Sequence, residues 1–474
     1  MKHTDIIQKL NLEQKCALLS GETVFTTRAL PGKGIPAITL SDGPNGVRKQ
    51  AGAADHLGLN PSVPATCFPT SSATACSWDE KLGEAVGEAL GEEAAAQEVA
   101  VLLGPGLNIQ RSPLCGRDFE YFSEDPILAG RMAAAYVRGI QKNGISACPK
   151  HFAVNSQELR RMASDSVLDE RTLRELYLTG FEIVVKEAKP KTIMTSYNLI
   201  NGTYANENAH LLQDILRKDW GFDGAVVTDW GGSNDHALGV KNGSTLEMPC
   251  PGGDSIRELM KAVQDGKISE ADVDARLDEM LELVLSTHAA VEKAPRTFDA
   301  AAHHKLARRA AAESIVLLRN EGGILPLKPN EKLAVIGDFA ETPRYQGAGS
   351  SAVNALQVDT LLDSIKADDS GITFVGYASG FERQGAADAE KLEEAMALAK
   401  KADTVLLCLG LDELRESEGL DRSDMKLAEN QQQLLAAVAA VNPNVVVLLS
   451  AGAPVETPWV GQCRALVYGA LGGQ

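Results

Sequence analysis

The sequence has no long apolar runs and comparatively little positive charge. No apolar stretch in the 474 residues approaches the length of a bilayer span, and the charged start MKHTDIIQKLNLEQK lacks the apolar centre of a signal peptide. We therefore expect a cytoplasmic protein with no membrane partner. The formal charge of −18 repels phosphate backbones and no basic stripe offsets it, so nucleic acid is not expected as a partner.

Motifs for metals and nucleotides are also missing. The eight cysteines are scattered without a CxxC pair, which favours buried reduced thiols over a zinc site or disulfide framework. The segment RYQGAGSSAVNA at 344–355 contains GxG but not the full G-x-G-x-x-G. His303 and His304 fall in a polar helical pattern, where we expect them to be solvated. We therefore expect no cofactor and no metal.

The length indicates more than one domain, because a chain of 474 residues is too long for one compact core. Residues 291–331 are charged and helical, then interrupted by Gly and Pro, as is typical of an interdomain linker. The sequence pattern restarts after this stretch. We therefore expect a first domain at 1–290, a linker at 291–331 and a second domain at 332–474.

In the first domain, short apolar runs alternate with amphipathic helical patterns. The expected strands are IPAITL, VAVLLG, GISACP, KTIMTSY and GAVVTDW. One expected helix begins at the N-cap Asp169 and has an apolar face of Leu173, Leu176, Tyr177, Phe181 and Val184. A second ends at Gly221 and has a stripe of Leu211, Leu212, Ile215 and Leu216. Such alternation predicts parallel βα units, for which a TIM-type (β/α) barrel is the commonest closed form.

The second domain repeats the alternation with more continuous apolar runs. They are KLAVIGDFA, ITFVGYA, ADTVLLCLGLDE, NVVVLLSAGAPVE and ALVYGALGG. Apolar runs without alternation are typical of strands buried on both faces, as in a parallel sheet covered by helices. The fold class expected for the whole chain is therefore α/β.

Polar and aromatic side chains follow four of the expected strands in the first domain. They are Asp42, Lys150 with His151, Met194 with Tyr197, and Asp229 with Trp230. In parallel α/β architectures the carboxyl ends of the strands meet at one face, so we expect these groups to converge there. Carboxylates and cations bind sugar hydroxyls and aromatic faces stack on the C–H surface of the ring, so the mixture suits a sugar.

Five motifs occur in order along the chain. They are SDGPNGVR at 41–48, CGRDFEYFSEDP at 115–126, KHFAVNSQELRR at 150–161, MTSYN at 194–198 and VVTDWGG at 226–232. Together they closely resemble glycoside hydrolase family 3, in its β-glucosidase branch, and the likeness runs over nearly the whole chain. The resemblance implies a (β/α) barrel followed by an α/β sandwich domain, with the active site between them. The 344–355 segment resembles the Gly/Ser-rich loop that leans over the barrel mouth in this family.

The resemblance also implies roles for individual residues. It makes Asp229 the nucleophile, whose carboxylate attacks the anomeric carbon and forms a glycosyl-enzyme that water hydrolyses with retention. Without the resemblance, Asp229 fits a helix N-cap equally well. The implied sugar-binding residues are Asp42, Arg117, Lys150, His151, Arg161, Met194, Tyr197 and Trp230. Each has a structural alternative; for example, Arg117 is also spaced to pair with Glu120 or Glu124.

A retaining enzyme also needs a second carboxyl group that first donates and then accepts a proton. One branch of the family uses an Asp–His pair after a KHFPGHG-like sequence, but the corresponding stretch here is KHFAVNSQE, without that His. The other branch takes a glutamate from the second domain, in a loop resembling EGxDR. Here the loop is LDELRESEGLDRSDMKL, in which Glu418 occupies that position and Glu416 is the second candidate. The structural alternative is a solvated acidic turn.

The function expected from the resemblance is removal of terminal β-D-glucosyl residues from a β-glucoside or gluco-oligosaccharide by double displacement. The alternatives are a catalytically silent sugar-binding protein, a β-xylosidase of the same family and, more distantly, a metal-dependent barrel lyase or aldolase. Members of the family normally continue past the sequence that resembles GALGGQ, so we expect a sandwich domain truncated at its C-terminus. The expected protein partner is accordingly a second copy of the chain, as a homo-oligomer, or another chain that completes this domain.

Overall fold

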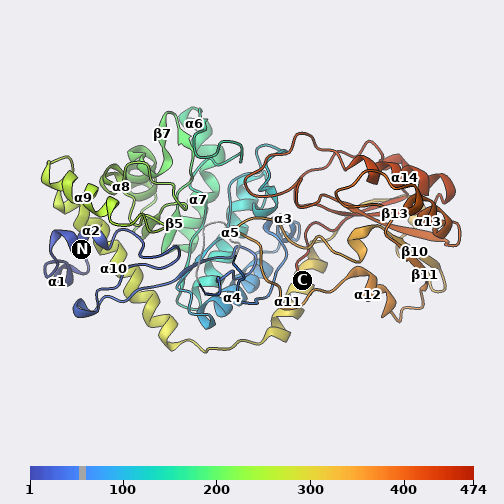
Figure 1. Cartoon of the computed structure of the whole chain (residues 1–474), viewed down its shortest axis with the longest axis horizontal. Coiled ribbons are helices and arrows are strands. Elements are labelled where there is room, and N and C mark those ends of the chain that lie inside the picture. The colour runs from blue at the N-terminus through green and yellow to red at the C-terminus, as the bar shows by residue number, and fades with distance from the viewer. Residues whose placement is uncertain (53–59) are drawn as a thin grey trace.

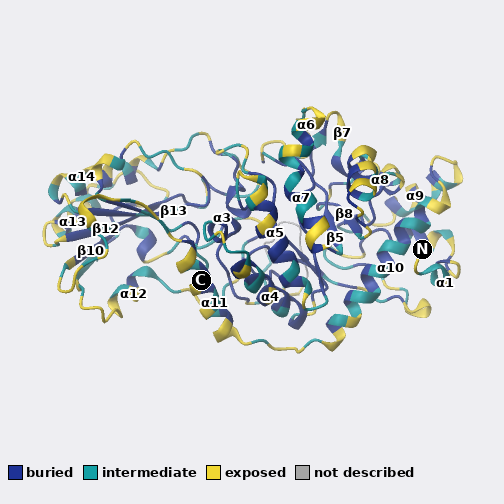
Figure 2. Ribbon diagram, turned by 180° about the vertical axis from the view of Figure 1, so that it is seen from behind, coloured by how far each residue is buried: buried dark blue, intermediate teal, exposed yellow. Residues whose placement is uncertain are grey.

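The structure, a computed structural model, describes residues 1–52 and 60–474. Figure 1 shows two lobes, with the N-terminal part of the chain in one and the C-terminal part in the other. Each lobe has its own apolar core, and Figure 2 shows buried residues concentrated inside both. The expected two-domain α/β organisation is confirmed. Within the described residues, no helix is both long and apolar enough to cross a lipid bilayer.

The first domain is built around short parallel strands. β1, β2 and β3 pair in that order, and β5 pairs with β8. Isolated parallel bridges extend the series from Gly106 to Lys150, from Phe152 to Thr195 and from Val227 to Leu246. The strands are β1 (Leu40–Asp42), β2 (Val101–Leu103), β3 (Ser146–Ala147), β5 (Thr192–Met194) and β8 (Ala225–Val227). Each lies in or at the end of one of the five runs expected to be strands, although all are only two or three residues long.

A small separate sheet lies beside this series. It contains β4 (Asp165–Ser166), β6 (Leu199–Ile200) and β7 (Thr203–Tyr204), with β6 in the middle. β6 pairs in parallel with β4 and antiparallel with β7.

Helices alternate with the parallel strands along the first domain. They are α1 (Thr4–Ile7), α2 (Leu12–Ala17), α3 (Ser71–Ala75), α4 (Glu80–Ala96), α5 (Pro126–Gln141), α6 (Glu170–Thr172), α7 (Thr179–Ile183), η6 (His210–Asp219), α8 (His236–Asn242) and α9 (Asp254–Gln264). α4 and α5 approach closely because glycines line their contact. A Cβ at Gly87 would lie 2.4 Å from the carbonyl oxygen of Tyr136, and one at Gly139 would lie 2.2 Å from that of Glu84.

The two amphipathic helices expected from the sequence are present. The Asp169 side chain caps the first by accepting a hydrogen bond of 2.7 Å from the Thr172 N–H. This helix is not uniform, because α6 and α7 are separated and followed by π-helical turns. The second is η6, whose apolar stripe is fully buried. It ends before Gly221, which has a φ of 75° and so stops the helix in the left-handed region.

The second domain is a six-stranded sheet in the order β11-β10-β12-β13-β14-β9. Its first five strands run parallel, and their apolar residues are largely buried, as expected. The strands are β9 (Val316–Asn320), β10 (Lys332–Ile336), β11 (Thr373–Ala378), β12 (Thr404–Gly410), β13 (Val445–Ser450) and β14 (Ala465–Tyr468). The helices are α12 (Leu361–Lys366), α13 (Ala389–Ala399) and α14 (Glu429–Val441).

The segment between the domains contains a helix, as its pattern indicated, and also a strand. α10 (Glu270–Lys293) is followed by α11 (Ala300–Ser314), and Figure 1 shows this part of the chain running along one edge of the molecule from the first lobe toward the second. β9 then pairs antiparallel with β14 at the edge of the second sheet. Residues 316–320, placed in the linker by the sequence pattern, therefore lie in the sheet of the second domain.

His303 on α11 is buried, so the expectation that it is solvated was wrong. Its Nδ1 lies 2.7 Å from Glu93 Oε1, its Nε2 lies 3.2 Å from Glu92 Oε2, and its ring stacks on Phe298. Partners from α4 thus cover a helix face that looks solvated in the sequence. A polar face predicts solvent contact only where no polar partner packs against it.

The residues after β14 return to the first domain. The Gln474 N–H donates to the Cys67 carbonyl at 2.8 Å, and the Thr70 N–H donates to the Leu471 carbonyl at 3.0 Å. These backbone contacts attach one end of the second sheet to the start of α3. The two domains are therefore joined by direct hydrogen bonds as well as by the connecting helices.

Candidate active site

The side chains that follow the first-domain strands meet at one face of the domain. Asp42 ends β1, Lys150 and His151 follow β3, and Asp229 follows β8. His151 Nε2 lies 3.7 Å from Asp229 Oδ2, although these residues are far apart in the sequence. The convergence follows from the parallel arrangement, because every such strand delivers its next residue to the same edge.

Asp229 is held on one side and open on the other. Its Oδ1 accepts a hydrogen bond of 2.8 Å from the Trp230 N–H, whereas its buried Oδ2 has no hydrogen-bond partner among the described residues. Burial raises the pKa of Asp229, and the nearby positive charges of Arg161, Arg117 and Lys150 oppose this rise. The arrangement fixes the orientation of the carboxylate while leaving one oxygen available to a bound molecule.

His151 is neutral and fixed in position. Its Nδ1 lies 3.1 Å from the Tyr121 hydroxyl, and the Asn108 side chain makes two hydrogen bonds to its backbone, with the His151 N–H and carbonyl oxygen. Asn108 therefore fixes the loop. Burial and the positive charges of Arg117 and Lys150 lower the pKa of His151 well below its usual value, so the imidazole carries no charge near neutral pH.

Lys150 and Asp42 form a charged corner of the site together with Glu120. Lys150 Nζ lies 3.2 Å from Glu120 Oε1, and both side chains are almost fully buried. Burial raises the pKa of Asp42 to about 6, while the positive charges of Lys150 and Arg48 act against the rise. A carboxyl group and an ammonium group next to each other can accept from and donate to neighbouring sugar hydroxyls.

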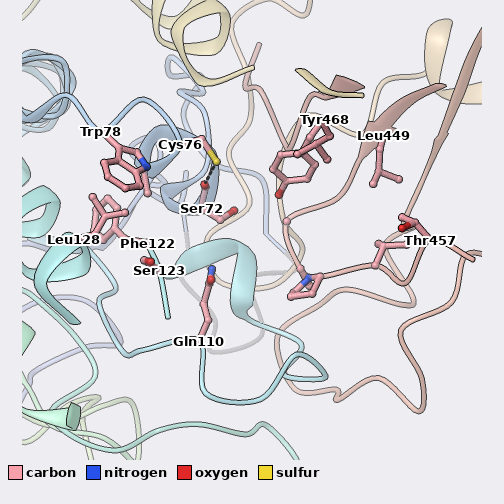
Figure 3. Close-up of a pocket in the computed structure, with 16 residues that line it drawn as sticks. Ser72, Cys76, Trp78, Gln110, Phe122, Ser123, Leu128, Leu449, Thr457 and Tyr468 are labelled. Atoms are coloured by element: carbon pink, nitrogen blue, oxygen red, sulfur yellow. Dashed lines mark hydrogen bonds between the residues drawn. The ribbon is translucent and has the colours of Figure 1, made fainter. Parts of the chain in front are cut away.

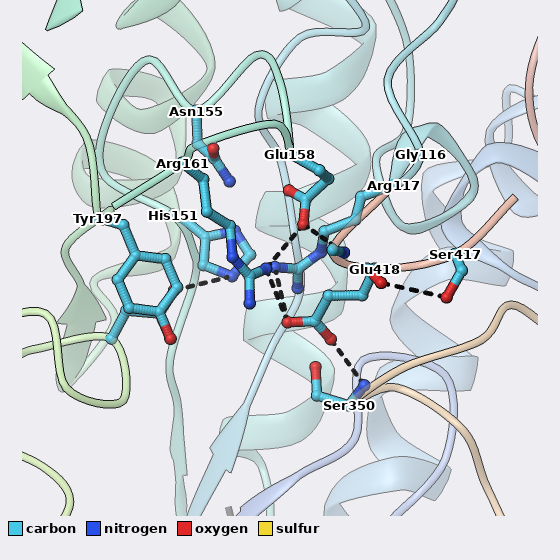
Figure 4. Close-up of polar contacts among 12 residues, drawn as sticks. Gly116, Arg117, His151, Asn155, Glu158, Arg161, Tyr197, Ser350, Ser417 and Glu418 are labelled. Atoms are coloured by element: carbon cyan, nitrogen blue, oxygen red, sulfur yellow. Dashed lines mark hydrogen bonds and ion pairs between the residues drawn. The ribbon is translucent and has the colours of Figure 1, made fainter. Parts of the chain in front are cut away.

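Two arginines of the first domain bind a carboxylate from the second. Arg161 Nη1 lies 2.8 Å from Glu418 Oε1, and Arg117 Nη1 lies 3.4 Å from the same oxygen, as Figure 4 shows. The same Arg161 nitrogen also lies 2.7 Å from Glu158, and Arg117 is paired through Nη2 with Glu120 at 2.6 Å. Three carboxylates and two guanidinium groups thus form one network across the domain boundary.

The second domain holds Glu418 from its own side. The Ser350 N–H donates to Glu418 Oε2 at 2.7 Å, and the Glu418 N–H donates to the Ala348 carbonyl at 3.0 Å. Burial acts to raise the pKa of Glu418, but Arg117, Arg161 and the Ser350 N–H outweigh it and hold this pKa well below its usual range. The carboxylate is therefore ionised in this arrangement.

The two glutamates considered from the sequence occupy different places. Glu418 joins the arginine network, whereas Glu416 is completely buried on the second-domain side, with Oε2 3.8 Å from Arg344 Nη2. The Arg344 guanidinium also donates to the Glu416 carbonyl at 2.8 Å. Only Glu418 contacts other residues predicted for the site.

The remaining predicted residues form an aromatic side of the site. The Tyr197 hydroxyl donates to the Trp230 carbonyl at 2.9 Å, and the Arg161 guanidinium lies 4.9 Å from the centre of the Tyr197 ring. The Trp230 indole N–H donates to the Val24 carbonyl, which orients the ring. Met194 is buried at the end of β5, where its backbone bonds to its neighbours.

Several residues of the network did not stand out in the sequence. Glu158, inside the third motif, was not singled out, although its i,i+3 spacing from Arg161 was an available signal. The Arg117–Glu120 pair, in contrast, was one of the alternatives expected from the sequence. Tyr121, Ser350 and Arg48 gave no comparable signal. Arg48 donates to the carbonyls of Gly349 and Ser350, and so holds the Gly/Ser-rich loop above the site.

The described part of the chain contains no group of three or more His, Cys, Asp or Glu side chains arranged to hold a metal ion. A separate pocket of about 460 Å³ lies between the domains, as Figure 3 shows. Its apolar lining includes Trp78, Phe122 and Leu128 from the first domain and Leu449 and Tyr468 from the second. None of the predicted site residues lines it.

These features define a site in which carboxylates and arginines from two α/β domains surround a strand-end carboxylate. The family profile of the "Glycosyl hydrolase family 3 N terminal domain" matches residues 48–283, and that of the "Glycosyl hydrolase family 3 C-terminal domain" matches residues 315–474. The chain therefore belongs to glycosyl hydrolase family 3, as its motifs indicated.

Individual relatives extend this comparison. The chain is 45% identical over 472 residues to "Thermostable beta-glucosidase B" of Acetivibrio thermocellus, covering 99% of this chain and 62% of that protein. It is 44% identical over 480 residues to an "Exo-alpha-(1->6)-L-arabinopyranosidase" of Bifidobacterium longum, covering 99% of this chain and 63% of that protein. The crystal structure of a Bifidobacterium adolescentis family 3 beta-glucosidase superposes with a TM-score of 0.92 at 42% identity, over 99% of this chain and 67% of that one. The chain thus spans less than two thirds of the length of these two curated relatives.

The charge of Asp42 leads to a prediction about stability. The folded-state pKa of about 6 lies above the ordinary value of 3.8, so between these values the folded protein binds more protons than the unfolded chain does. The contribution of Asp42 to the stability of the folded state should therefore decrease as the pH rises from about 4 to about 6. Because Asn resembles the neutral acid at every pH, Asp42→Asn should raise Tm at pH 7 and change it little at pH 4.

Melting curves of the wild type and Asp42→Asn at pH 4, 5, 6 and 7 measure this difference. A Tm difference that stays constant across this range would show that ionisation of Asp42 has no effect on stability.

Proposed function

We propose that the chain hydrolyses terminal β-D-glucosyl residues from β-glucosides with retention, in a site between a TIM-type (β/α) barrel and an α/β sandwich domain. The observation that carries this proposal is the pair of carboxylates at the domain boundary. Asp229 comes from a strand end of the first domain and Glu418 from a loop of the second, and the positive charges of Arg117 and Arg161 act on both. Retaining hydrolysis needs two such carboxyl groups on opposite sides of the scissile bond.

Asp229 acts as the nucleophile in this proposal. Its Oδ2, which has no hydrogen-bond partner within the described residues, attacks the anomeric carbon, and the bond to the leaving oxygen breaks. The Trp230 N–H keeps the other oxygen in place during the attack. The neutral imidazole of His151, 3.7 Å away, is available to a sugar hydroxyl because it does not form an ion pair with Asp229.

Glu418 acts as the acid and then as the base. Its ionised form, bound to two arginines, is the form that takes a proton from water when the glycosyl-enzyme is hydrolysed. In the first step it must carry a proton, which requires weaker contacts with the arginines. Sugar hydroxyls that accept hydrogen bonds from Arg117 and Arg161 replace the carboxylate there, and its pKa rises.

The other charged groups bind the sugar. Asp42 and Lys150 at the buried corner accept from and donate to adjacent hydroxyls, while Trp230 and Tyr197 line the aromatic side. Contacts of this kind strengthen as the ring flattens toward the transition state. Met194, which is buried at the end of β5, is assigned to shaping the pocket for the sugar ring.

The substrate class is inferred from the relatives. Relatives from Acetivibrio thermocellus and Bacteroides ovatus, at 45% and 35% identity, are named beta-glucosidases, and this supports a β-glucoside. A second candidate is an α-L-arabinopyranoside, because the Bifidobacterium longum relative at 44% identity carries that name. The two sugars differ at the exocyclic carbon and one ring hydroxyl, so a single set of nitrophenyl glycoside substrates distinguishes them.

Turnover of nitrophenyl glycosides tests the proposal directly. The wild type should release nitrophenol from the β-D-glucoside faster than from the α-L-arabinopyranoside or the β-D-xyloside, and NMR of the first product should show β-glucose. Early appearance of α-glucose would mean inversion. Binding of glucose without any turnover would instead identify a sugar-binding protein.

Replacement of the nucleophile gives a second prediction. Asp229→Ala should lower kcat for the aryl β-glucoside by about 10⁴-fold or more, since the covalent route is lost. Azide fits the space left by the carboxylate and attacks from the same side, so it should restore part of the activity and yield the α-glucosyl azide. Activity near the wild-type level in Asp229→Ala would exclude Asp229 as the nucleophile.

Replacement of the acid gives a third prediction. Glu418→Ala should lower kcat/KM for cellobiose by about 10²–10⁴-fold, because that leaving group needs a proton. With dinitrophenyl β-glucoside, whose leaving group does not, formation of the glycosyl-enzyme should be affected much less. Azide should then capture the intermediate as the β-glucosyl azide.

Glu416→Gln is the matched control for this experiment. Since Glu416 lies against Arg344 and away from the network, any loss in this variant should be equal for both leaving groups. A leaving-group-dependent loss in Glu416→Gln alone would transfer the acid role to that residue.

A further inference from the structure

The loop that carries Glu418 is fastened to the first domain by a second carboxylate three residues further on. Asp421 Oδ1 accepts hydrogen bonds from the Gly116 N–H at 3.2 Å and the Glu158 N–H at 2.9 Å. Its Oδ2 accepts from the Leu159 N–H at 2.8 Å and again from the Glu158 N–H at 3.1 Å. One side chain of the second domain thus binds two separate loops of the first domain through backbone groups.

These two loops also carry the arginines of the network. Gly116 immediately precedes Arg117, and Leu159 lies two residues before Arg161. The carboxylate of Asp421 therefore sets the distance between the Glu418 loop and both arginines. Hydrogen bonds from N–H groups to a carboxylate are stronger and shorter than those to a neutral acceptor, so the attachment is firm.

The backbone of the first domain is shaped for this close contact. A Cβ at Gly116 would lie 1.7 Å from the Leu420 carbonyl oxygen and 2.4 Å from that of Ser417, so any side chain there would push the loop away. The Gly419 N–H also donates to Glu158 Oε2 at 2.8 Å, and the Arg422 N–H donates to the Leu114 carbonyl at 2.8 Å. Contacts on both sides of Glu418 therefore fix the loop against the first domain.

We infer that Asp421 is the positioning residue for Glu418: it docks the second-domain loop onto the first domain so that the Glu418 carboxyl group reaches the scissile bond. The inference rests on the proposed role of Glu418 as acid and base. Asp421 itself donates no proton to the substrate, because four backbone hydrogen bonds occupy its two oxygens. A displacement of about 1 Å in a catalytic group lowers rates by about 10²-fold, which sets the scale of its effect.

The first test compares leaving groups in Asp421→Ala. We expect kcat/KM for cellobiose to fall by about 10–10²-fold, with a much smaller change for dinitrophenyl β-glucoside, since only the poor leaving group needs the acid. Asp421→Asn retains one oxygen acceptor and should give an intermediate loss. A loss that was equal for both substrates would mean that Asp421 only stabilises the fold, and the inference would be withdrawn.

Asp424→Ala is the matched control. Asp424 lies in the same loop and accepts a hydrogen bond of 2.8 Å from the Lys426 N–H, and its ion-pair partner is Arg415, also of the second domain. Removing this carboxylate should leave the ratio of kcat/KM for cellobiose to kcat/KM for dinitrophenyl β-glucoside at the wild-type value. If Asp424→Ala shifted the ratio as much as Asp421→Ala, the effect would come from loss of loop charge and not from docking.

A double-mutant cycle separates failure of this inference from failure of the proposed function. If Asp421 acts through Glu418, Asp421→Ala should lower the cellobiose rate no further once Glu418→Ala is present. Additive losses would overturn the positioning role. If Glu418→Ala alone showed no leaving-group dependence, the proposed acid would be wrong, whatever Asp421 did.

Gly116→Ala provides an independent route if Asp421→Ala does not fold. It leaves the Asp421 carboxylate in place but separates the same two loops sterically, so it should reproduce the dependence on leaving group. Melting curves of each variant establish that the folded protein is being compared. If the Gly116→Ala variant folds and its ratio of kcat/KM for the two substrates equals that of the wild type, the docking argument is contradicted.

Discussion

The pairing of Glu418 with Arg117 and Arg161 is the interaction on which the arrangement of the two domains depends. The first domain alone would present two arginines that have lost one shared counter-ion, and Arg117 is 1% exposed. A buried charge without its partner is strongly destabilising, whereas a complete network is tolerated. The arginines of the first domain therefore need the carboxylate of the second domain as a counter-ion. The site can form only when the two domains are in firm contact.

The same network explains how groups of similar type acquire different properties. Positive charge and burial together keep His151 neutral, while the arginines keep Glu418 ionised despite its burial. Asp42 is partly buried and Asp229 is buried, both beside positive charges, yet loss of solvent prevails and raises the pKa of each. On the proposed mechanism, the substrate competes with Glu418 for the arginines, so binding and protonation of the acid are one coupled event.

The sequence predicted the positions of strands better than the contacts between loops. Short apolar runs marked every strand of the parallel series. The positions at strand ends alone predicted that His151 and Asp229 would meet, since topology fixes their common face. The partners of buried polar groups were not readable. His303 was expected in solvent because its helix is polar. Asp421 looked like part of an acidic turn, since the groups that donate hydrogen bonds to it are backbone N–H groups far along the chain. Almost every residue has a backbone N–H, so the residue types do not reveal which of these groups will donate to a side chain.

The position of β9 at the edge of the second sheet has a consequence for synthesis on the ribosome. β9 is the first strand of that sheet to emerge, but β14, the strand with which it pairs in the described part of the chain, is the last, after four intervening strands. At typical elongation rates the nascent β9 waits on the order of ten seconds for its partner. Its residues Leu317 and Leu318 remain about half exposed even in the folded chain, at 52% and 58%. During translation this strand is thus an apolar segment without a strand to pair with, and a chaperone can be expected to bind it.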